Sequence, residues 1–432
     1  MKKRLGIYIH IPFCSVKCDY CNFYSLAGRD ELMPAYEAAL VRHIGEHATL
    51  LDGFDIDTVY FGGGTPGYFG ADRLGRILGA VRTTDASEHI LPGAETAGER
   101  ILRDAHTASG RVLPDAHTVS GRVLPDAHTA LGRILSDAEI TVEVNPGSAS
   151  GAGLEKLRRA GFNRLSVGVQ CADDRLLKLI GRRHTFADAE HTIRSARDAG
   201  FNNISVDVIY GLPEQSMDSW VETLDKAIAL NAEHISCYGL KIEEGTRLYA
   251  QKDSPAVPSD ETQADMYLYT VETLAQHGYT QYEISNFARE GYESKHNLKY
   301  WLGGSYLGFG PAAHSYIGKQ RFSFITDVAL YIEKVNSGVN VTDYSEDITA
   351  SQGAAEYLML RLRTTTGISP EEFGGLTGMS TESIEQMQEL FAKYEANGLA
   401  SKTNRRWRFT PKGFLVSNVL IGQLLDACCM DL

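Results

Sequence analysis

The chain of 432 residues, with 43% hydrophobic residues and a mean hydropathy of -0.21, is long enough for a large α/β domain and a smaller one. Its formal net charge of -13 argues against nucleic acid as a partner, because phosphate binding needs clustered Lys and Arg. Seven cysteines, three of them close together, fit a reducing compartment, and since we expect no signal peptide or membrane-length apolar run we predict a cytoplasmic protein.

The first predicted strand, residues 5–11, leads directly into a cluster of thiols. Cys14, Cys18 and Cys21 follow this strand with the spacing C-x3-C-x2-C. Thiolates are soft ligands that select iron–sulfur clusters, zinc or copper(I). A cubane 4Fe–4S cluster held by three thiolates keeps one iron that a small molecule can chelate. The alternative is a structural zinc site with His10 as the fourth ligand.

A helix over 31–48, with Asp30 as its N-cap, precedes the second predicted strand, residues 58–61. That strand runs into Gly-Gly-Gly-Thr-Pro at 62–66. Glycines allow the backbone to approach a ligand closely and leave its N–H groups free to donate. Such a run is weak evidence alone, but after a strand and together with the cysteine motif it indicates a ligand site. A helix over 71–81 follows.

The two motifs together resemble those of the radical S-adenosylmethionine (radical SAM) superfamily. The resemblance implies a 4Fe–4S cluster on Cys14, Cys18 and Cys21, whose open iron binds the amino and carboxylate groups of S-adenosylmethionine. An electron from the cluster then cleaves the sulfonium and releases a 5′-deoxyadenosyl radical, while the protein supplies position and electrostatics. The glycine run is similar to the GGxTP motif, which contacts the amino group of the cofactor.

An eleven-residue unit repeats between residues 100 and 132, as RILRDAHTASG, RVLPDAHTVSG and RVLPDAHTALG. Its period is shorter than those of common solenoid repeats, and its prolines and glycines would interrupt a helix. One interpretation is a metal ladder of His106, His117 and His128; the other, which we favour, is a surface insert without metal. Because the insert, at about 83–136, precedes a strand, we place it on the barrel face away from the chemistry.

Alternating strands and helices resume after the insert and predict an α/β fold with a partial (β/α)6 TIM-like barrel over 1–245. The expected strands are 139–144, 164–169, 203–209 and 234–240. The expected helices are 153–160, a stretch from 174 that carries Arg182, 187–199 and 217–229. Apolar residues on both strand faces indicate a parallel sheet covered by helices, with chemistry at the carboxyl ends of the strands.

Residues at these strand ends resemble the S-adenosylmethionine site of the oxygen-independent coproporphyrinogen III oxidase family. The set is Tyr8, Gly63, Gly64, Thr65, Glu143, Gln170, Arg182 and Asp207. The resemblance implies that Glu143 pairs with the ammonium group of the cofactor and Arg182 with its carboxylate. It places Asp207 and Gln170 on the ribose and adenine, and Tyr8 against the cluster-bound cofactor. Taken singly, each charged residue would be interpreted as a surface charge. We assign no catalytic residue.

Residues 246–345 predict an extension of the barrel and a lid over its mouth, beginning with a helix over 261–277. The block His-Asn-Leu-Lys-Tyr-Trp at 296–301 is typical of the branch of the family called HemW, the heme chaperones. A histidine beside tyrosine and tryptophan can contact heme, which makes His296 a possible heme contact. The alternative is that His296 and Trp301 pack the lid onto the barrel.

A small C-terminal domain is expected over 349–432. Three helices, a hairpin with three arginines and a final helix give a winged-helix-like α+β domain of the HemN type. The expected helices are 352–363, 370–377 with Ser369 as N-cap, and 381–397, and the hairpin is 399–410. Because the chain is acidic, we assign this domain a structural or docking role rather than DNA binding.

Two departures from the true coproporphyrinogen oxidases point to the heme chaperone branch. The oxidases have a further cysteine where this chain has Phe23, and a long segment before the motif where this chain has thirteen residues. We therefore expect a protein without oxidase activity that binds heme, a 4Fe–4S cluster and S-adenosylmethionine, and transfers heme to an acceptor such as a respiratory enzyme. An electron donor would serve the cluster, and membrane contact would be at most peripheral, through the acceptor.

Two alternatives remain open. The first is an oxidase that decarboxylates the propionates of coproporphyrinogen III to vinyl groups in porphyrin biosynthesis. The second is a zinc-stabilised binding module.

Overall fold

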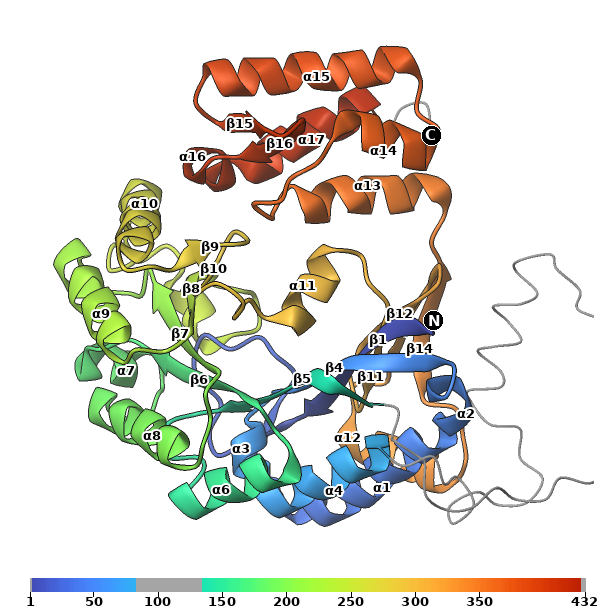
Figure 1. The fold of residues 1–432 in the computed structure, drawn as a ribbon. Coiled ribbons are helices and arrows are strands. Elements are labelled where there is room, and N and C mark those ends of the chain that lie inside the picture. Colours follow the sequence, from blue (N-terminus) through green and yellow to red (C-terminus); the bar gives the residue numbers. More distant parts are fainter. Residues whose placement is uncertain (1, 83–133, 429–432) are drawn as a thin grey trace, which may run out of the picture.

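The computed structural model describes residues 2–82 and 134–428. They form one long sheet flanked by helices and a smaller, mainly helical unit beside it (Figure 1). The sheet has twelve strands in the order β14-β13-β12-β11-β1-β4-β5-β6-β7-β8-β10-β9. The repeats, with His106, His117 and His128, lie outside the described residues, so their interpretation stays a prediction.

Six neighbouring parallel strands form the core of the barrel and confirm the predicted (β/α)6 architecture. They are β1 (Lys3–Ile11), β4 (Phe54–Gly63), β5 (Ile134–Val144), β6 (Arg164–Gln170), β7 (Ile204–Tyr210) and β8 (His234–Gly239). The helices along their outer side in Figure 1 are α1 (Met33–Glu46), α4 (Ala71–Arg82), α6 (Gly151–Ala160), α8 (Phe186–Asp198) and α9 (Met217–Ala229). Because parallel strands end at the same edge, their carboxyl ends form one mouth of the barrel.

The two faces of these parallel strands differ in polarity. Outward-facing side chains such as Val59, Val142 and Val206 are buried in the large hydrophobic core. Inward-facing side chains are polar, and Ser166 of β6 donates a hydrogen bond to Asp207 of β7 at 2.8 Å. The prediction that the strands are apolar on both faces is therefore wrong for the inner face. A polar inner face suits a ligand better than a packed apolar core would.

The sheet continues beyond the parallel strands at both edges. At one edge β8 pairs antiparallel with β10 (Asn286–Ala288), which pairs with β9 (Thr280–Gln281). At the other edge β11 (Tyr306–Phe309) is parallel to β1, and an antiparallel series follows: β12 (His314–Ile317), β13 (Gln320–Phe324) and β14 (Thr342–Asp347). The remaining elements of the connections are α2 (Ala48–Leu51), α3 (Pro66–Phe69), α7 (Asp174–Leu179), α10 (Asp260–Gln276) and α12 (Val328–Asn336).

Helix α11 (Lys295–Trp301) lies inside the curve of the parallel strands, between the two edges of the sheet (Figure 1). Glu139 of β5 accepts hydrogen bonds from the backbone N–H groups of Lys295 and His296 at 3.1 and 3.0 Å. Thr58 Oγ1 of β4 lies 2.8 Å from His296 Nδ1. Both partners lie well before the carboxyl ends of their strands, so α11 occupies the amino-terminal end of the barrel. The prediction that this segment belongs to a lid over the mouth is therefore wrong for α11.

The C-terminal unit supplies most of a second hydrophobic core, to which α10 adds Tyr267. Its elements are α13 (Ala350–Arg361), α14 (Pro370–Thr377), α15 (Thr381–Ala396), β15 (Ala400–Thr403), β16 (Arg406–Phe409), α16 (Pro411–Leu415) and α17 (Ser417–Cys428). The rings of Phe391 and Trp407 stack in this core with centroids 5.3 Å apart. Ser369 accepts a hydrogen bond from the N–H of Glu372 at 3.3 Å, which confirms the predicted N-cap of α14.

Two local predictions are wrong. Asp30 does not cap the first long helix, because a short 3-10 turn (Asp30–Leu32) comes first and α1 begins at Met33 with Pro34 in its first turn. Arg182 is not helical, because α7 ends at Leu179 and Gly181 follows with a φ of 78°. Within the described residues, no helix is long and apolar enough to cross a membrane.

Candidate cluster and cofactor site

The cysteine loop, residues 12–25, begins where β1 ends at Ile11, at the mouth of the barrel. Cys14 is in a two-residue strand, β2 (Phe13–Cys14), which pairs with β3 (Leu26–Ala27) and closes the loop at its base. Cys14 is buried, whereas Cys18 and Cys21 are half-buried. Backbone hydrogen bonds hold the middle of the loop at Asp19, whose N–H donates to Ile180 and whose carbonyl accepts from Leu248. The three predicted ligands thus lie in one anchored loop.

Burial of the thiols affects their protonation. Burial raises the pKa of the Cys14 thiol above its ordinary value, although the hydroxyl of Thr65 opposes the shift. Burial likewise raises the pKa of the Cys21 thiol. Both are therefore thiols rather than thiolates at neutral pH, and a bound cation has to displace their protons. Loading of this site should accordingly release protons.

A chain of hydrogen bonds connects Cys14 to the tip of its own loop by way of two strand ends. Thr65 Oγ1 donates to Cys14 Sγ at 3.4 Å and accepts from Asn145 Nδ2 at 2.9 Å. Arg182 Nη1 donates to Asn145 Oδ1 at 2.6 Å, and its Nη2 donates to Tyr20 Oη at 2.7 Å. The structure therefore brings Thr65 and Arg182 together at the mouth, beside the cysteine loop, and their roles toward the cofactor stay predictions.

The glycine run lies directly against the chain that leaves β1. A Cβ atom added at Gly63, whose φ is 111°, would lie 2.5 Å from His10 Cε1, and one added at Gly64 would lie 2.8 Å from the Phe13 carbonyl oxygen. The N–H of Gly64 donates to the last carbonyl of β1 at 2.8 Å, and that of Thr65 donates to Phe13 at 2.8 Å. Both N–H groups therefore already have partners. The prediction that they are free to donate to a ligand is wrong for Gly64 and Thr65. The glycines are needed for close packing of β4 against the base of the cysteine loop.

Glu143 and its neighbours form a polar group on the inner face, between the mouth and α11. Tyr60 Oη donates to Glu143 Oε1 at 2.7 Å, and the Tyr60 ring stacks on Tyr8 with centroids 6.3 Å apart. Burial, together with the charge of Asp207, raises the pKa of the Glu143 carboxyl to about 7. A carboxyl group that titrates near neutrality can accept the proton of a bound ammonium group or remain ionised beside it.

Gln170 ends β6 in an unusual backbone conformation. Its φ of 68° is in the left-handed region, although it is not a glycine, and the strand pairing shifts register at Gly168. Its side chain is buried, and a Cβ atom added at Gly168 would lie 2.6 Å from Gln170 Nε2 and 2.9 Å from Asn145 Oδ1. The amide therefore lies beside the Arg182 network. Strained residues of this kind often occur where a protein positions a ligand group.

His10 does not have the contacts of a zinc ligand. Its Nδ1 lies 3.0 Å from Tyr8 Oη and its Nε2 lies 3.0 Å from the Tyr24 carbonyl oxygen, so both ring nitrogens are in hydrogen bonds. Among residues 2–82 and 134–428, no group of three or more His, Cys, Asp or Glu side chains converges as a single metal ion requires. Thiolates that bind three different irons of a cubane need not converge on one point, so the three cysteines fit a cluster better than zinc.

His296 is almost fully buried at the amino-terminal end of the barrel. Its Nε2 lies 2.9 Å from Tyr300 Oη, its Nδ1 bonds to Thr58, and its ring stacks on Tyr60 at 5.2 Å. Burial lowers its pKa to about 3, so the ring is neutral. A heme contact through either nitrogen would require one of these hydrogen bonds to break. The geometry matches the alternative in which His296 packs α11 onto the strands, and a heme contact stays a prediction.

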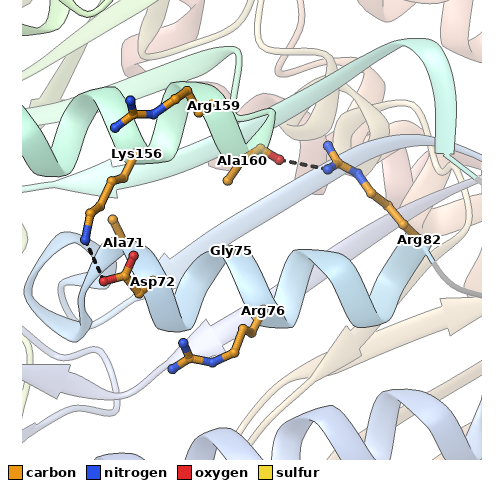
Figure 2. A pocket seen from close by; sticks show the side chains of 8 residues that line it. All are labelled: Ala71, Asp72, Gly75, Arg76, Arg82, Lys156, Arg159 and Ala160. Carbon is orange, nitrogen blue, oxygen red and sulfur yellow. Dashed lines mark hydrogen bonds and ion pairs between the residues drawn. The ribbon is translucent and has the colours of Figure 1, made fainter.

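A groove on the outer surface, of about 500 Å³, is separate from this site. It lies between α4 and α6, and Figure 2 shows its cations in internal contacts: Lys156 pairs with Asp72 at 2.8 Å, and Arg82 donates to the Ala160 carbonyl at 2.8 Å. Arg76 points away from α6 in this view and pairs with Glu37. Most of the positive charge around the groove is therefore already compensated.

Sequence reasoning missed two residues of the site. Asn145 bridges Thr65 and Arg182, and Tyr20 accepts from Arg182. The sequence does contain an indication for Asn145, because this residue directly follows the predicted strand that carries Glu143 and so is expected at the mouth. Tyr20 lies between two of the cysteines, and nothing in the sequence marks it as a partner of Arg182.

Comparison with known proteins places this geometry in a family. Residues 8–227 match the radical SAM superfamily, and residues 348–416 match the HemN C-terminal domain. Heme chaperone HemW of Bacillus subtilis (strain 168) is 32% identical over 425 residues, which cover 97% of this chain and 98% of that protein. Heme chaperone HemW of Escherichia coli (strain K12) is 30% identical over 422 residues, which cover 96% and 97%.

The fold has a counterpart of known structure. Coproporphyrinogen III oxidase (HemN) from Escherichia coli, a radical SAM enzyme, superposes with a TM-score of 0.76 at 22% identity, over 100% of this chain and 91% of that chain. This likeness supports the fold, while the similarity to the HemW proteins extends over both the barrel and the C-terminal unit. The chain belongs to the radical SAM superfamily and, within it, to the family of the heme chaperone HemW.

Proposed function

We propose that this protein is a heme chaperone that binds heme and passes it to an acceptor protein. The observation that carries the proposal is the similarity to HemW proteins over nearly the whole of both chains. It is supported by Phe23, whose side chain is 70% exposed at the edge of the cysteine loop where the oxidases have a further cysteine. The acceptor, for example a respiratory enzyme, and an electron donor for the cluster are the partners, and the cytoplasm is the proposed location.

Membership of the radical SAM superfamily implies a 4Fe–4S cluster and S-adenosylmethionine. In our proposal Cys14, Cys18 and Cys21 hold the cluster. Tyr8, Gly63, Gly64, Thr65, Glu143, Gln170, Arg182 and Asp207 surround the cofactor. When bound, the cluster supplies an electron to the sulfonium of the cofactor. Arg182 balances the carboxylate charge and Glu143 the ammonium charge, and the hydrogen bond from Arg182 to Tyr20 fixes Arg182 relative to the thiols.

We propose that three successive parts of the chain have different roles. The barrel of residues 1–245 holds the cluster and cofactor, residues 246–345 extend the sheet and close the amino-terminal end, and residues 349–432 form a docking domain. We assign docking to the last domain because most of its hydrophobic core comes from its own residues, as in a distinct domain.

The alternative is an oxygen-independent coproporphyrinogen III oxidase. The likeness of the fold to HemN does not separate the two functions, because proteins of one fold perform different reactions. The absence of a thiol at Phe23 and the full-length similarity to HemW favour the chaperone.

The deciding experiment uses the purified protein after anaerobic reconstitution of the cluster. On titration with heme we expect a Soret band that saturates, and on addition of an apoprotein acceptor we expect that band to move to the acceptor. With reductant, S-adenosylmethionine and coproporphyrinogen III, we expect no protoporphyrinogen IX. Rapid decarboxylation would establish the oxidase instead, and failure to bind heme would refute the chaperone.

A further inference from the structure

A cavity of about 430 Å³ lies at the amino-terminal side of the barrel, where the end of α11 and strands β11 to β13 meet α13. We call it the α11–α13 cavity. Five aromatic side chains line it: Tyr300, Trp301, Tyr306, Tyr316 and Tyr357. Its volume is in the range of pockets that hold small molecules and cofactors.

The cavity wall combines apolar surface with an arginine, Arg361, that has a hydrogen-bond donor unpaired within the described chain. Leu302 and Met359 are 40% and 37% exposed although both are large apolar residues, and both line the cavity. The guanidinium of Arg361 lies 5.3 Å from the ring centroid of Tyr357, and its Nη2 donates to the Leu302 carbonyl at 3.3 Å. Its Nε is buried and has no hydrogen-bond partner among the described residues. A buried donor without a partner is unfavourable, so Arg361 would gain by turning toward an acceptor in the cavity.

The second arginine of the cavity wall is already paired with carboxylates. Arg321 donates to Glu356 at 2.7 Å and to Glu346 at 3.1 Å, so its charge is compensated within the chain. The cavity therefore offers Arg361, whose Nε has no partner among the described residues, at the edge of an aromatic wall. A ligand that matches it has a flat apolar body and an anionic group at its periphery.

We propose that the α11–α13 cavity receives the porphyrin of heme, an inference that rests on the proposed chaperone function. The aromatic walls pack against the macrocycle, and Arg361 donates to a propionate. Met359 adds a thioether, one of the side-chain types that ligate heme iron. This location differs from a contact at His296, which faces the strands on the other side of α11.

The proposed heme position is separate from the cysteine loop. Tyr306 pairs with Gly6 of β1, and the loop begins only after Ile11. Five residues of strand correspond to roughly 16 Å along the barrel. Heme should therefore bind whether or not the cluster is present.

The first test fills the cavity. Gly353 lines it from α13, and a Cβ atom added there meets only Ile348 Cγ2, at 3.8 Å, so Gly353→Leu should leave the helix intact or strengthen it. The matched control is Gly375→Leu in α14, where an added Cβ has nothing within 4 Å. We expect Gly353→Leu to weaken heme binding by about tenfold or more in a Soret titration, and the control to bind like the unaltered protein.

The second test addresses the propionate. Arg361→Gln should lower the affinity for heme but not for heme dimethyl ester, whose propionates carry no charge. Arg408→Gln, at an exposed position of β16, serves as the control. Thermal unfolding of each variant checks that the fold is retained.

The outcomes separate the two proposals. If the unaltered protein binds heme and Gly353→Leu binds it equally well, the cavity is not the site, while the chaperone function stands. If Arg361→Gln loses affinity for heme and its ester alike, the pairing with a propionate is wrong. If the unaltered protein binds no heme, both proposals are wrong.

Discussion

Arg182 donates a hydrogen bond from Nη2 to Tyr20 Oη at 2.7 Å, and so ties the segment between α7 and α8 to the middle of the cysteine loop. Arg182 Nε lies 3.2 Å from the same oxygen. A side chain proposed to bind the cofactor carboxylate thus also holds the loop that carries the thiols. Loop geometry and cofactor binding should therefore be coupled.

The first prediction concerns this coupling. Tyr20→Phe removes the hydroxyl and leaves Arg182 without this partner, so we expect a several-fold loss of S-adenosylmethionine affinity with nearly normal iron content. Affinity is measured by equilibrium dialysis of the reconstituted protein and iron by colorimetry. Cys18→Ala is the contrasting variant and should lose most of its iron, because a thiolate ligand is gone. Equal iron loss in both variants would show that Tyr20 acts on the cluster itself.

The second prediction concerns Glu143, whose carboxyl pKa is raised to about 7 by burial. Below pH 7 this group is protonated and cannot balance a cationic ammonium, so S-adenosylmethionine should bind more weakly at pH 6 than at pH 8. Glu143→Gln should bind weakly at both values. Because the ligand titrates in the same way with either protein, the difference between the two pH profiles isolates Glu143. Parallel profiles would exclude this role.

The third prediction concerns His296, whose pKa is lowered to about 3 in the folded protein and is 6.5 when unperturbed. Between these values the unfolded chain binds a proton that the folded chain does not. Stability is therefore full above pH 6.5 and decreases as the pH falls below it, by about 1.4 kcal/mol per pH unit for one such group.

The variant His296→Phe tests this dependence. It retains the ring that stacks on Tyr60 but loses the hydrogen bonds to Thr58 and Tyr300, so it should be less stable by about 1–3 kcal/mol at pH 8. Between pH 5 and 6 its urea unfolding free energy should depend less steeply on pH than that of the unaltered protein. An unchanged slope would show that His296 is not neutral in the fold.

The fourth prediction concerns the repeats. Deletion of residues 99–132 should leave iron content and S-adenosylmethionine binding nearly unchanged, because the flanking residues lie away from the site: Arg82 ends α4, and Ile134 pairs with Ile56 near the start of β4. Those positions lie at the end of the barrel opposite the thiols. Loss of either property on deletion would assign the repeats a role beyond occupying a connection.

The barrel could be predicted because strand and helix patterns are local. The parallel strands have apolar outward faces between turn residues, and α9 and α14 have the predicted bounds. The position of α11 could not be predicted in this way. It depends on Glu139 accepting the first N–H groups of the helix across a separation of about 156 residues, and no local pattern encodes such a contact.

The candidate site also has one part that could be predicted from the sequence and another that could not. The cysteine spacing and the glycine run are contiguous motifs, so their placement together at the mouth followed from the strand order. The Arg182 network did not, because it depends on Asn145 and Tyr20 from different segments whose side chains meet only in the folded barrel. The role of the glycines also differed, since close packing against His10 and Phe13 is invisible without the neighbouring strand.

The position of α11 closes the barrel at the amino-terminal ends of its strands. His296 and Glu139 hold this helix against β4 and β5 at the amino-terminal end of the barrel, whereas the thiols lie at the carboxyl ends of the strands. The same helix presents Tyr300 to the cavity behind it and links Tyr300 to His296 by a hydrogen bond. This short helix thus separates the inside of the barrel from the α11–α13 cavity, and the two sides are linked by the hydrogen bond between His296 and Tyr300.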